Sequence, residues 1–251
     1  MDNEISTANG RTLQMRSLKT AAVIGRGKIS GHLPSLFKSF FSYFIMLERN
    51  TSYTAINLNT IDVVILAVQD RNIESTYNQL KEFFPSTVKF IHLSGAQTFP
   101  DIIGIHPLMT FSAESKVKDY SQVPLFTDNV DFYEAYKNET KNLRFIRSDL
   151  KIKYHAMAVM LGNFSQYYLQ QIKNSFPTEL NFDDFKLLTL NSVKNIFKEE
   201  SNGMLTGPLI RNDQETISKH KNELKHSEPA LLRTYQMMES MFKQELLRNE
   251  N

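Results

Sequence analysis

Short apolar runs recur along the first 150 residues and are separated by segments with helical spacing. The apolar runs predict strands at residues 21–24, 43–47, 61–68, 88–93, 102–105, 123–127 and 143–147. Residues 61–68 read IDVVILAV, a continuous run typical of a parallel strand that is buried on both faces. The intervening helices are predicted at residues 28–39, 73–84 and 130–142, and Pro34 predicts an irregular or kinked turn in the first. This alternation predicts an α/β fold with a mostly parallel sheet.

Residues 18–31, LKTAAVIGRGKISG, carry the first strand directly into a glycine loop. Gly25 and Gly27 match the first two positions of G-x-G-x-x-G, and Ser30 is the small residue at the third. In such a loop, backbone N–H groups at a helix N-terminus approach a pyrophosphate. The pattern predicts a dinucleotide-binding loop, with an ordinary strand-to-helix turn as the alternative. The predicted cofactor-binding residues of the loop are Gly25, Arg26, Gly27, Lys28 and Ile29.

Two charged residues follow the second predicted strand, about twenty residues past the glycines, where a side chain that reads the ribose is expected. Glu48 would bond a ribose 2′-hydroxyl and favour NAD, whereas Arg49 would pair with the 2′-phosphate of NADP. These residues by themselves leave the choice of cofactor open.

Further cofactor-binding candidates lie where later strands end, because open α/β sheets bind ligands at the carboxyl ends of their strands. They are Val68, Gln69, Ser94, Gly95 and His106. His106 is expected near the nicotinamide, but a turn histidine bonded to backbone beside Pro107 is also compatible with the sequence. His92 lies inside an apolar strand, and we interpret it as structural.

Strand patterns disappear beyond residue 153, where helices are predicted at residues 154–176, 185–200, 213–224 and 229–248. We therefore expect a loose leader at residues 1–17, a Rossmann dinucleotide-binding domain at 18–150 and an all-α substrate and dimerisation domain at 151–251. A homodimer through this domain is predicted, because residues 154–176 and 231–247 carry more apolar surface than about a hundred residues readily cover.

Composition excludes several classes of function. The 29 Lys and Arg residues nearly balance the 27 Asp and Glu residues, so charge favours neither a nucleic-acid nor a membrane partner. The chain has no cysteine, no G-x-S-x-G motif and no pair of its six histidines at i, i+4, which argues against thiol, serine-hydrolase and metal chemistry. Residues 1–17 lack the plan of a signal peptide, and the longest apolar stretch, 33–47, is too short to span a bilayer, so we expect a cytoplasmic protein.

Three polar residues in the helical half, His155, Asn163 and Arg211, are candidates for chemistry on a substrate. On a helix, His155, Val159, Gly162 and Asn163 fall within one broad face, although His155 is also explained as a satisfied helix histidine. Arg211 follows a Gly-Pro turn and precedes Asp213, a predicted N-cap. Its guanidinium could clamp a carboxylate, and an ordinary surface arginine is the alternative.

Four stretches resemble a known family: HLSGA at 92–96, HPLMTF at 106–111, YHAMAVMLGNF at 154–164 and LTGPLIRND at 205–213. Residues 19–235 are similar to the Rossmann-like NAD(P)-dependent reductases whose helical C-terminal domain, resembling that of 6-phosphogluconate dehydrogenase, was long catalogued as one of unknown function. Their relatives are ketopantoate reductases, pyrroline-carboxylate reductases and hydroxyacid dehydrogenases. The chain departs from the family at Asn212, where glycine is usual, and at Ser30, where glycine or alanine is often found. Lys153 is followed four residues later by Met157 instead of the usual Asn.

The resemblance implies an NADP(H)-dependent reductase of a small keto acid, with 2-dehydropantoate in pantothenate synthesis as the first candidate. It places Arg49 at the 2′-phosphate and implies that the helical domain closes the site and often dimerises. With the usual Lys–Asn pair missing, His155 is the predicted proton donor, Asn163 orients the carbonyl and Lys153 is the alternative donor. Thr206 and Arg211 are the predicted substrate-binding residues. The alternatives are an imino-acid reductase and a non-catalytic NADP-binding regulatory protein.

Overall fold

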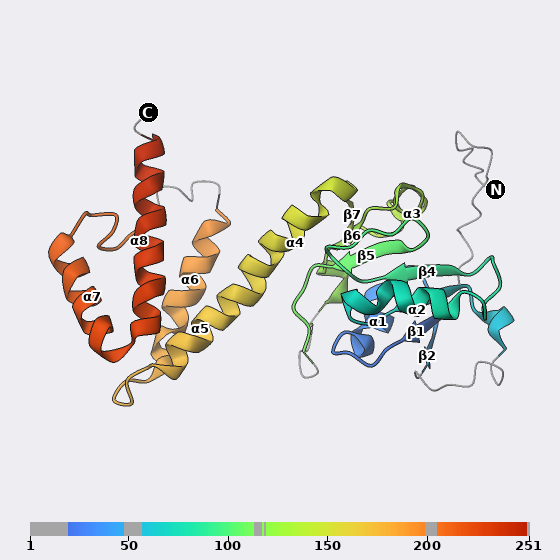
Figure 1. Ribbon diagram of the computed structural model, residues 1–251, viewed down its shortest axis with the longest axis horizontal. Coiled ribbons are helices and arrows are strands. Elements are labelled where there is room, and N and C mark those ends of the chain that lie inside the picture. The colour runs from blue at the N-terminus through green and yellow to red at the C-terminus, as the bar shows by residue number, and fades with distance from the viewer. Residues whose placement is uncertain (1–19, 48–56, 113–116, 118, 199–204, 250–251) are drawn as a thin grey trace. The chain divides into compact units, whose positions relative to one another are not determined.

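The computed structural model describes residues 20–47, 57–112, 117, 119–198 and 205–249 of the chain (Figure 1). The predicted leader at residues 1–17 lies outside this part, as do Glu48 and Arg49. Among the described residues, contacts divide the chain into two compact units after Asn163, and each is described by itself.

The first unit is built on a mostly parallel sheet with strand order β2-β1-β3-β4-β5-β6-β7 (Figure 1). The strands are β1 Thr20–Ile24, β2 Tyr43–Leu47, β3 Val63–Leu66, β4 Lys89–His92, β5 Ile103–Pro107, β6 Leu125–Thr127 and β7 Leu143–Phe145. Neighbouring strands are parallel except β5 and β6, which pair antiparallel. The predicted α/β class with a Rossmann-like, mostly parallel sheet is thus confirmed. Because β1 lies between β2 and β3, the strand order reverses beside β1, the position at which such sheets bind ligands.

Alternate residues of the central strands pack into two cores, one on each face of the sheet. From β3, Val63 and Ile65 join the core under α1 (Leu33–Phe37) and α3 (Val130–Tyr136), while Val64 and Leu66 join the core under α2 (Ile73–Leu80). All four are fully buried, which explains the continuous apolar run at this strand. The sheet is therefore held rigid from both sides, and its carboxyl edge can position a site.

Several predicted boundaries of strands and helices were wrong. The helix expected at 28–39 is a 3₁₀ turn at Ser30–His32 followed by α1, so Pro34 occupies the first helical turn, where no kink is required. The helices expected at 73–84 and 130–142 end at Leu80 and Tyr136, with turns beyond them. Apolar residues such as Ile61 and Phe84 are buried outside regular elements, and this burial made the patterns longer than the strands and helices.

The helical region confirms the predicted all-α C-terminal part. The helix α4 (Lys151–Val159) is followed without a break by a π-helical segment, Met160–Phe164, and by α5 (Ser165–Asn174). The remaining helices are α6 (Lys186–Ile196), α7 (Gln214–Ser227) and α8 (Pro229–Asn249). The predicted division at residue 150 assigns α4 to the helical domain, whereas contacts group α4 with the first unit, so that division stays a prediction.

Local chemistry stabilises α7 and α8. The Asp213 side chain accepts a hydrogen bond from the Thr216 backbone N–H at 3.0 Å, which confirms the predicted N-cap. Between the two helices, Lys221 lies 3.1 Å from the Glu239 carboxylate. No helix in the described part of the chain is long and apolar enough to cross a membrane.

Candidate functional site

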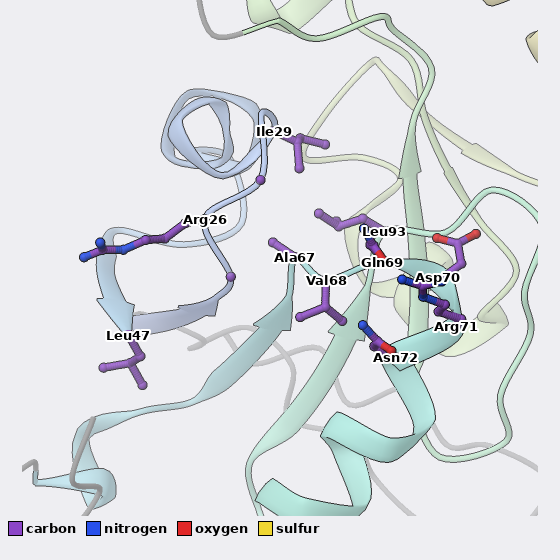
Figure 2. A pocket seen from close by; sticks show the side chains of 12 residues that line it. Arg26, Ile29, Leu47, Ala67, Val68, Gln69, Asp70, Arg71, Asn72 and Leu93 are labelled. Atoms are coloured by element: carbon purple, nitrogen blue, oxygen red, sulfur yellow. The ribbon is translucent and has the colours of Figure 1, made fainter. Parts of the chain in front are cut away.

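A pocket of about 860 Å³ lies at the carboxyl ends of β1 and β3 (Figure 2). It is lined by the glycine loop, the end of β2 and the segment that follows β3. The lining residues are Gly25, Arg26, Gly27, Ile29, Leu47, Ala67, Val68, Gln69, Asp70, Arg71, Asn72 and Leu93. Six predicted cofactor-binding residues therefore line one pocket, namely Gly25, Arg26, Gly27, Ile29, Val68 and Gln69.

Gly25 is required by both conformation and space. Its φ is +119°, and a Cβ placed there would lie 2.3 Å from the Ala67 carbonyl oxygen. Gly27 is less constrained, since its Cβ would lie 3.9 Å from the same oxygen. The first glycine thus lets the loop backbone pass directly against the end of β3.

Charged side chains lie on opposite sides of this pocket. Figure 2 shows Arg26 extending toward Leu47 at the end of β2, and Asp70 and Arg71 grouped beyond the end of β3. Lys28 is exposed and is not among the lining residues, so its contact with a cofactor stays a prediction.

Ser94 joins the pocket to the next part of the site. Its hydroxyl donates to the Asp70 carboxylate at 2.5 Å and accepts hydrogen bonds from the N–H groups of Ala96 and Gln97. The loop after β4 is therefore tied to a residue that lines the pocket. Asp70 follows Gln69 at the carboxyl edge of the sheet, but it was not among the predicted cofactor-binding residues, because an acidic residue after a strand has no distinctive spacing.

Two predicted histidines from distant segments meet over Gly95. A Cβ on Gly95 would lie 2.6 Å from His155 Cδ2 and 3.0 Å from His106 Cε1, so only glycine leaves room for both rings. The ring centroids of His106 and His155 are 5.7 Å apart, and the Tyr154 hydroxyl lies 2.8 Å from His106 Nδ1. The structure thus brings together Gly95, His106 and His155 at the carboxyl ends of β4 and β5, as parallel strands require.

His106 is a neutral imidazole at neutral pH. Burial is the main reason that its pKa falls from 6.5 to about 4, and the nearby His155 and Lys151 lower it further. Burial also raises the pKa of the Tyr154 hydroxyl. Both shifts favour the uncharged forms, so a neutral imidazole and a protonated phenol hydrogen-bond directly here.

A second cluster, of buried charged residues that the sequence reasoning missed, contacts the loop after β4. Lys151 Nζ is 3.0 Å from Asp128 Oδ2, and the two side chains are only 4% and 6% exposed. Lys151 also donates to the Gln97 carbonyl, and Thr98 Oγ1 donates to Asp128 Oδ2 at 2.8 Å. The available signal was the i, i+4 spacing of Lys151 and His155, which puts both on one helix face.

His92 belongs to this cluster and has the structural role expected of it. The ring is fully buried, and Nδ1 accepts a hydrogen bond from the Ser94 backbone N–H at 3.2 Å. Nε2 therefore carries the proton, and among the described residues it has no hydrogen-bond partner. Burial, assisted by Lys151, lowers the pKa of His92 to about 4.

The other predicted site residues are Lys153, Asn163, Thr206 and Arg211, and their roles stay predictions. Lys153 and Asn163 are exposed. The predicted helix face shared by His155 and Asn163 assumed α-helical angles, which was wrong, because Met160–Phe164 is π-helical. Thr206 and Arg211 are exposed residues of the second unit.

Asn212 explains one departure from the resembled family. Its φ is 53°, in the left-handed region that favours glycine and that Asn tolerates. A glycine and an asparagine can therefore support the same turn here. In the described part of the chain, no group of three or more His, Cys, Asp or Glu side chains could hold a metal ion.

Comparison with known proteins supports the fold. The model of a family described as a domain of unknown function, DUF2520, matches residues 133–241, less than half of the chain. No curated protein matches. Among solved structures, a Bacteroides fragilis protein described provisionally as an NADP oxidoreductase is 19% identical, with a TM-score of 0.66 over 89% of this chain and 97% of that one.

Two further solved structures agree. A Thermotoga maritima protein is 19% identical with a TM-score of 0.63, covering 92% of this chain and all of that one (100%). An imine reductase from Streptomyces aurantiacus is 12% identical with a TM-score of 0.57, covering 90% and 94%. At these identities the similarity establishes the architecture, and the chain is a Rossmann-like α/β protein with a helical C-terminal region.

Proposed function

We propose that this protein is a nicotinamide-dinucleotide-dependent reductase of a small carbonyl or imine compound. The observation that carries the proposal is the pocket over Gly25, joined through Ser94 to the histidine pair His106 and His155. The glycine loop would hold a dinucleotide pyrophosphate, and Gly95, His106 and His155 at the ends of β4 and β5 would face the nicotinamide. The structural similarity to oxidoreductases is compatible with this function.

The chain's own residues would handle the proton. When bound, the dinucleotide supplies a hydride, and reduction of a C=O or C=N group then requires a proton at the oxygen or nitrogen. We assign that donation to His155, whose ring lies beside His106 and the hydroxyl of Tyr154. Lys153 is the alternative donor, and Thr206 and Arg211 are the residues that the sequence resemblance assigns to the substrate and its carboxylate.

The first candidate substrate is a small 2-keto acid, with 2-dehydropantoate as the single best choice from the sequence resemblance. An imino acid is the second candidate, and similarity to imine reductases from Streptomyces aurantiacus and Bacillus cereus favours testing it equally. A non-catalytic NADP-binding regulatory protein is the third.

A substrate panel separates these candidates. Purified protein is first titrated with NADPH and NADH by calorimetry, and keto and imino acids are then screened by loss of reduced-nicotinamide absorbance. Turnover with one class identifies the reaction. Tight NADPH binding with no turnover on any compound supports a regulatory protein, and binding of neither cofactor rejects the proposal.

Arg49→Ala is expected to weaken NADPH binding about 10-fold to 100-fold and to leave NADH binding unchanged, because a charge-assisted bond to the 2′-phosphate contributes roughly 1.5–3 kcal/mol. Calorimetric titration with both cofactors measures the difference. Arg147→Ala is a matched control, since Arg147 is exposed and paired with Asp149. Equal losses for the two cofactors would refute the assignment of Arg49.

A homodimer formed through the helical unit is expected in sedimentation at micromolar concentration. Large apolar side chains of α6 and the residue after it are exposed in the single chain, at 70% for Leu187, 64% for Leu188 and 83% for Phe197. Burial of such a surface stabilises association. A monomeric sedimentation coefficient at this concentration would contradict the prediction.

A further inference from the structure

His106, Tyr154 and His155 are called the proton-transfer group below. We propose that the buried Lys151–Asp128 ion pair positions this group, because it holds α4 where Tyr154 and His155 contact His106. The proposal rests on the function proposed above, in which this group delivers the proton. Lys151 is a positioning residue and not the donor, because its ammonium group is buried and already held by Asp128 and Gln97.

The ion pair joins three separate segments at the edge of the sheet. Lys151 is the first residue of α4, Asp128 follows β6, and Gln97 belongs to the loop after β4. A cation in the first turn of a helix is unfavourable, because the N-terminal end of the helix dipole is positive. Lys151 therefore does not stabilise α4 as an isolated helix. Its contacts with Asp128 and Gln97 explain why a lysine lies at this position.

Gly104 in β5 makes room for this arrangement. A Cβ at that position would lie 2.5 Å from Asp128 Oδ1 and 3.0 Å from both Lys151 Nζ and His92 Nε2. Three polar side chains thus converge on the one point of β5 that has no side chain. Any larger residue would push Lys151, and with it the start of α4, away from the sheet.

The position of Lys151 at the start of α4 determines where Tyr154 and His155 lie. Residues 151–159 form a regular α-helix, so Tyr154 and His155 lie three and four positions after Lys151 on the same face. The same face meets His106 through the Tyr154 hydroxyl and the His155 ring. Fixing the first residue of α4 therefore fixes where these two side chains meet β5.

The charges of the cluster also act on the two buried histidines. Lys151 lowers the pKa of His92 and of His106, whereas Asp128 raises that of His92. Asp70 raises both, the neighbouring His155 lowers that of His106, and His106 lowers that of His92. Removing the cation and removing the anion should therefore move the pKa of His92 in opposite directions.

The test uses Lys151→Met, Lys151→Arg and Asp128→Asn in the full chain, with imidazole NMR titrations as the main measurement. In Lys151→Met the pKa values of His92 and His106 should rise, and in Asp128→Asn that of His92 should fall below its wild-type value. Lys151→Arg should keep both pKa values near those of the wild type.

Turnover assays are the second measurement. In Lys151→Met and Asp128→Asn, kcat should fall by on the order of 10-fold to 100-fold, because a small displacement of a group that takes part in the reaction is costly. Lys151→Arg should restore most of it, and NADPH affinity should change less than twofold.

A general loosening of the core would instead move both histidines toward their ordinary pKa of 6.5 in every variant, and that result would overturn the proposal. So would wild-type kcat in Lys151→Met. If Lys151→Met does not fold, the direction of the His92 shift in Asp128→Asn decides. The titrations need neither cofactor nor substrate, so if the wild-type protein binds no dinucleotide, the proposed function fails while the positioning role is still tested.

Discussion

Gly25→Ala is expected to reduce dinucleotide affinity by at least about 100-fold, the largest effect that we expect from any single methyl group in this chain. At φ +119° an L-residue is strained, and the added Cβ would lie 2.3 Å from the Ala67 carbonyl oxygen. Neither atom can yield, because one belongs to the loop backbone and the other to the backbone that follows β3. The loop must therefore move away from β3, and its N–H groups lose their direction toward the pocket.

Gly31→Ala is the matched control for this variant. A Cβ on Gly31 meets nothing within 4 Å, its φ is not in the left-handed region, and it lies in the 3₁₀ turn just after the loop. NADPH titration by calorimetry and thermal unfolding should be measured for both variants. Comparable affinities of Gly25→Ala and Gly31→Ala would show that the glycine loop does not bind the cofactor.

His155→Gln is expected to lower kcat by roughly 10²-fold to 10⁴-fold with NADPH binding intact, the range that is usual for a positioned general acid. The ring contacts Gly95 and His106 at the ends of β4 and β5, where the reacting end of a bound dinucleotide is proposed to lie. Glutamine keeps a polar side chain of similar size but cannot donate a proton as an acid. Steady-state turnover and NADPH titration, measured on the same preparation, separate the loss of chemistry from a loss of binding.

Lys153→Ala is the corresponding control, because Lys153 lies in the same helix and is exposed. It should keep near-normal turnover. If His155→Gln were active and Lys153→Ala inactive, the two roles would be reversed, and the proton would come from a lysine as in the hydroxyacid dehydrogenases that the sequence resembles.

Local patterns predicted most of the parts of the site but not their assembly. The glycine loop and the ends of β3, β4 and β5 could be located because a buried parallel strand must be continuously apolar and must end in a loop. His106 and His155 were singled out separately, one after a strand and one on a helix. That they share the space over Gly95 depends on the place of α4 beside the sheet, which periodicity does not encode.

Local patterns also failed to single out two residues of the site. Lys151 and Asp128 are ordinary charged residues in sequence, and only their burial against Gly104 makes them unusual. The sequence does not indicate the π-helical segment at Met160–Phe164 either, because the same residues would satisfy an α-helical pattern. The α-helical angle between His155 and Asn163 therefore does not hold in the folded chain.

By itself the sequence determined the α/β class, the glycine loop and the all-α C-terminal part, because each depends on residues that are close together in the chain. Only the tertiary structure decided which distant side chains meet: Asp70 with Ser94, His106 with Tyr154 and Lys151 with Asp128. The physical reason is that the energy of these pairs comes from burial and from partners contributed by other elements. In the sequence, a lysine that will form a buried ion pair cannot be distinguished from a surface lysine.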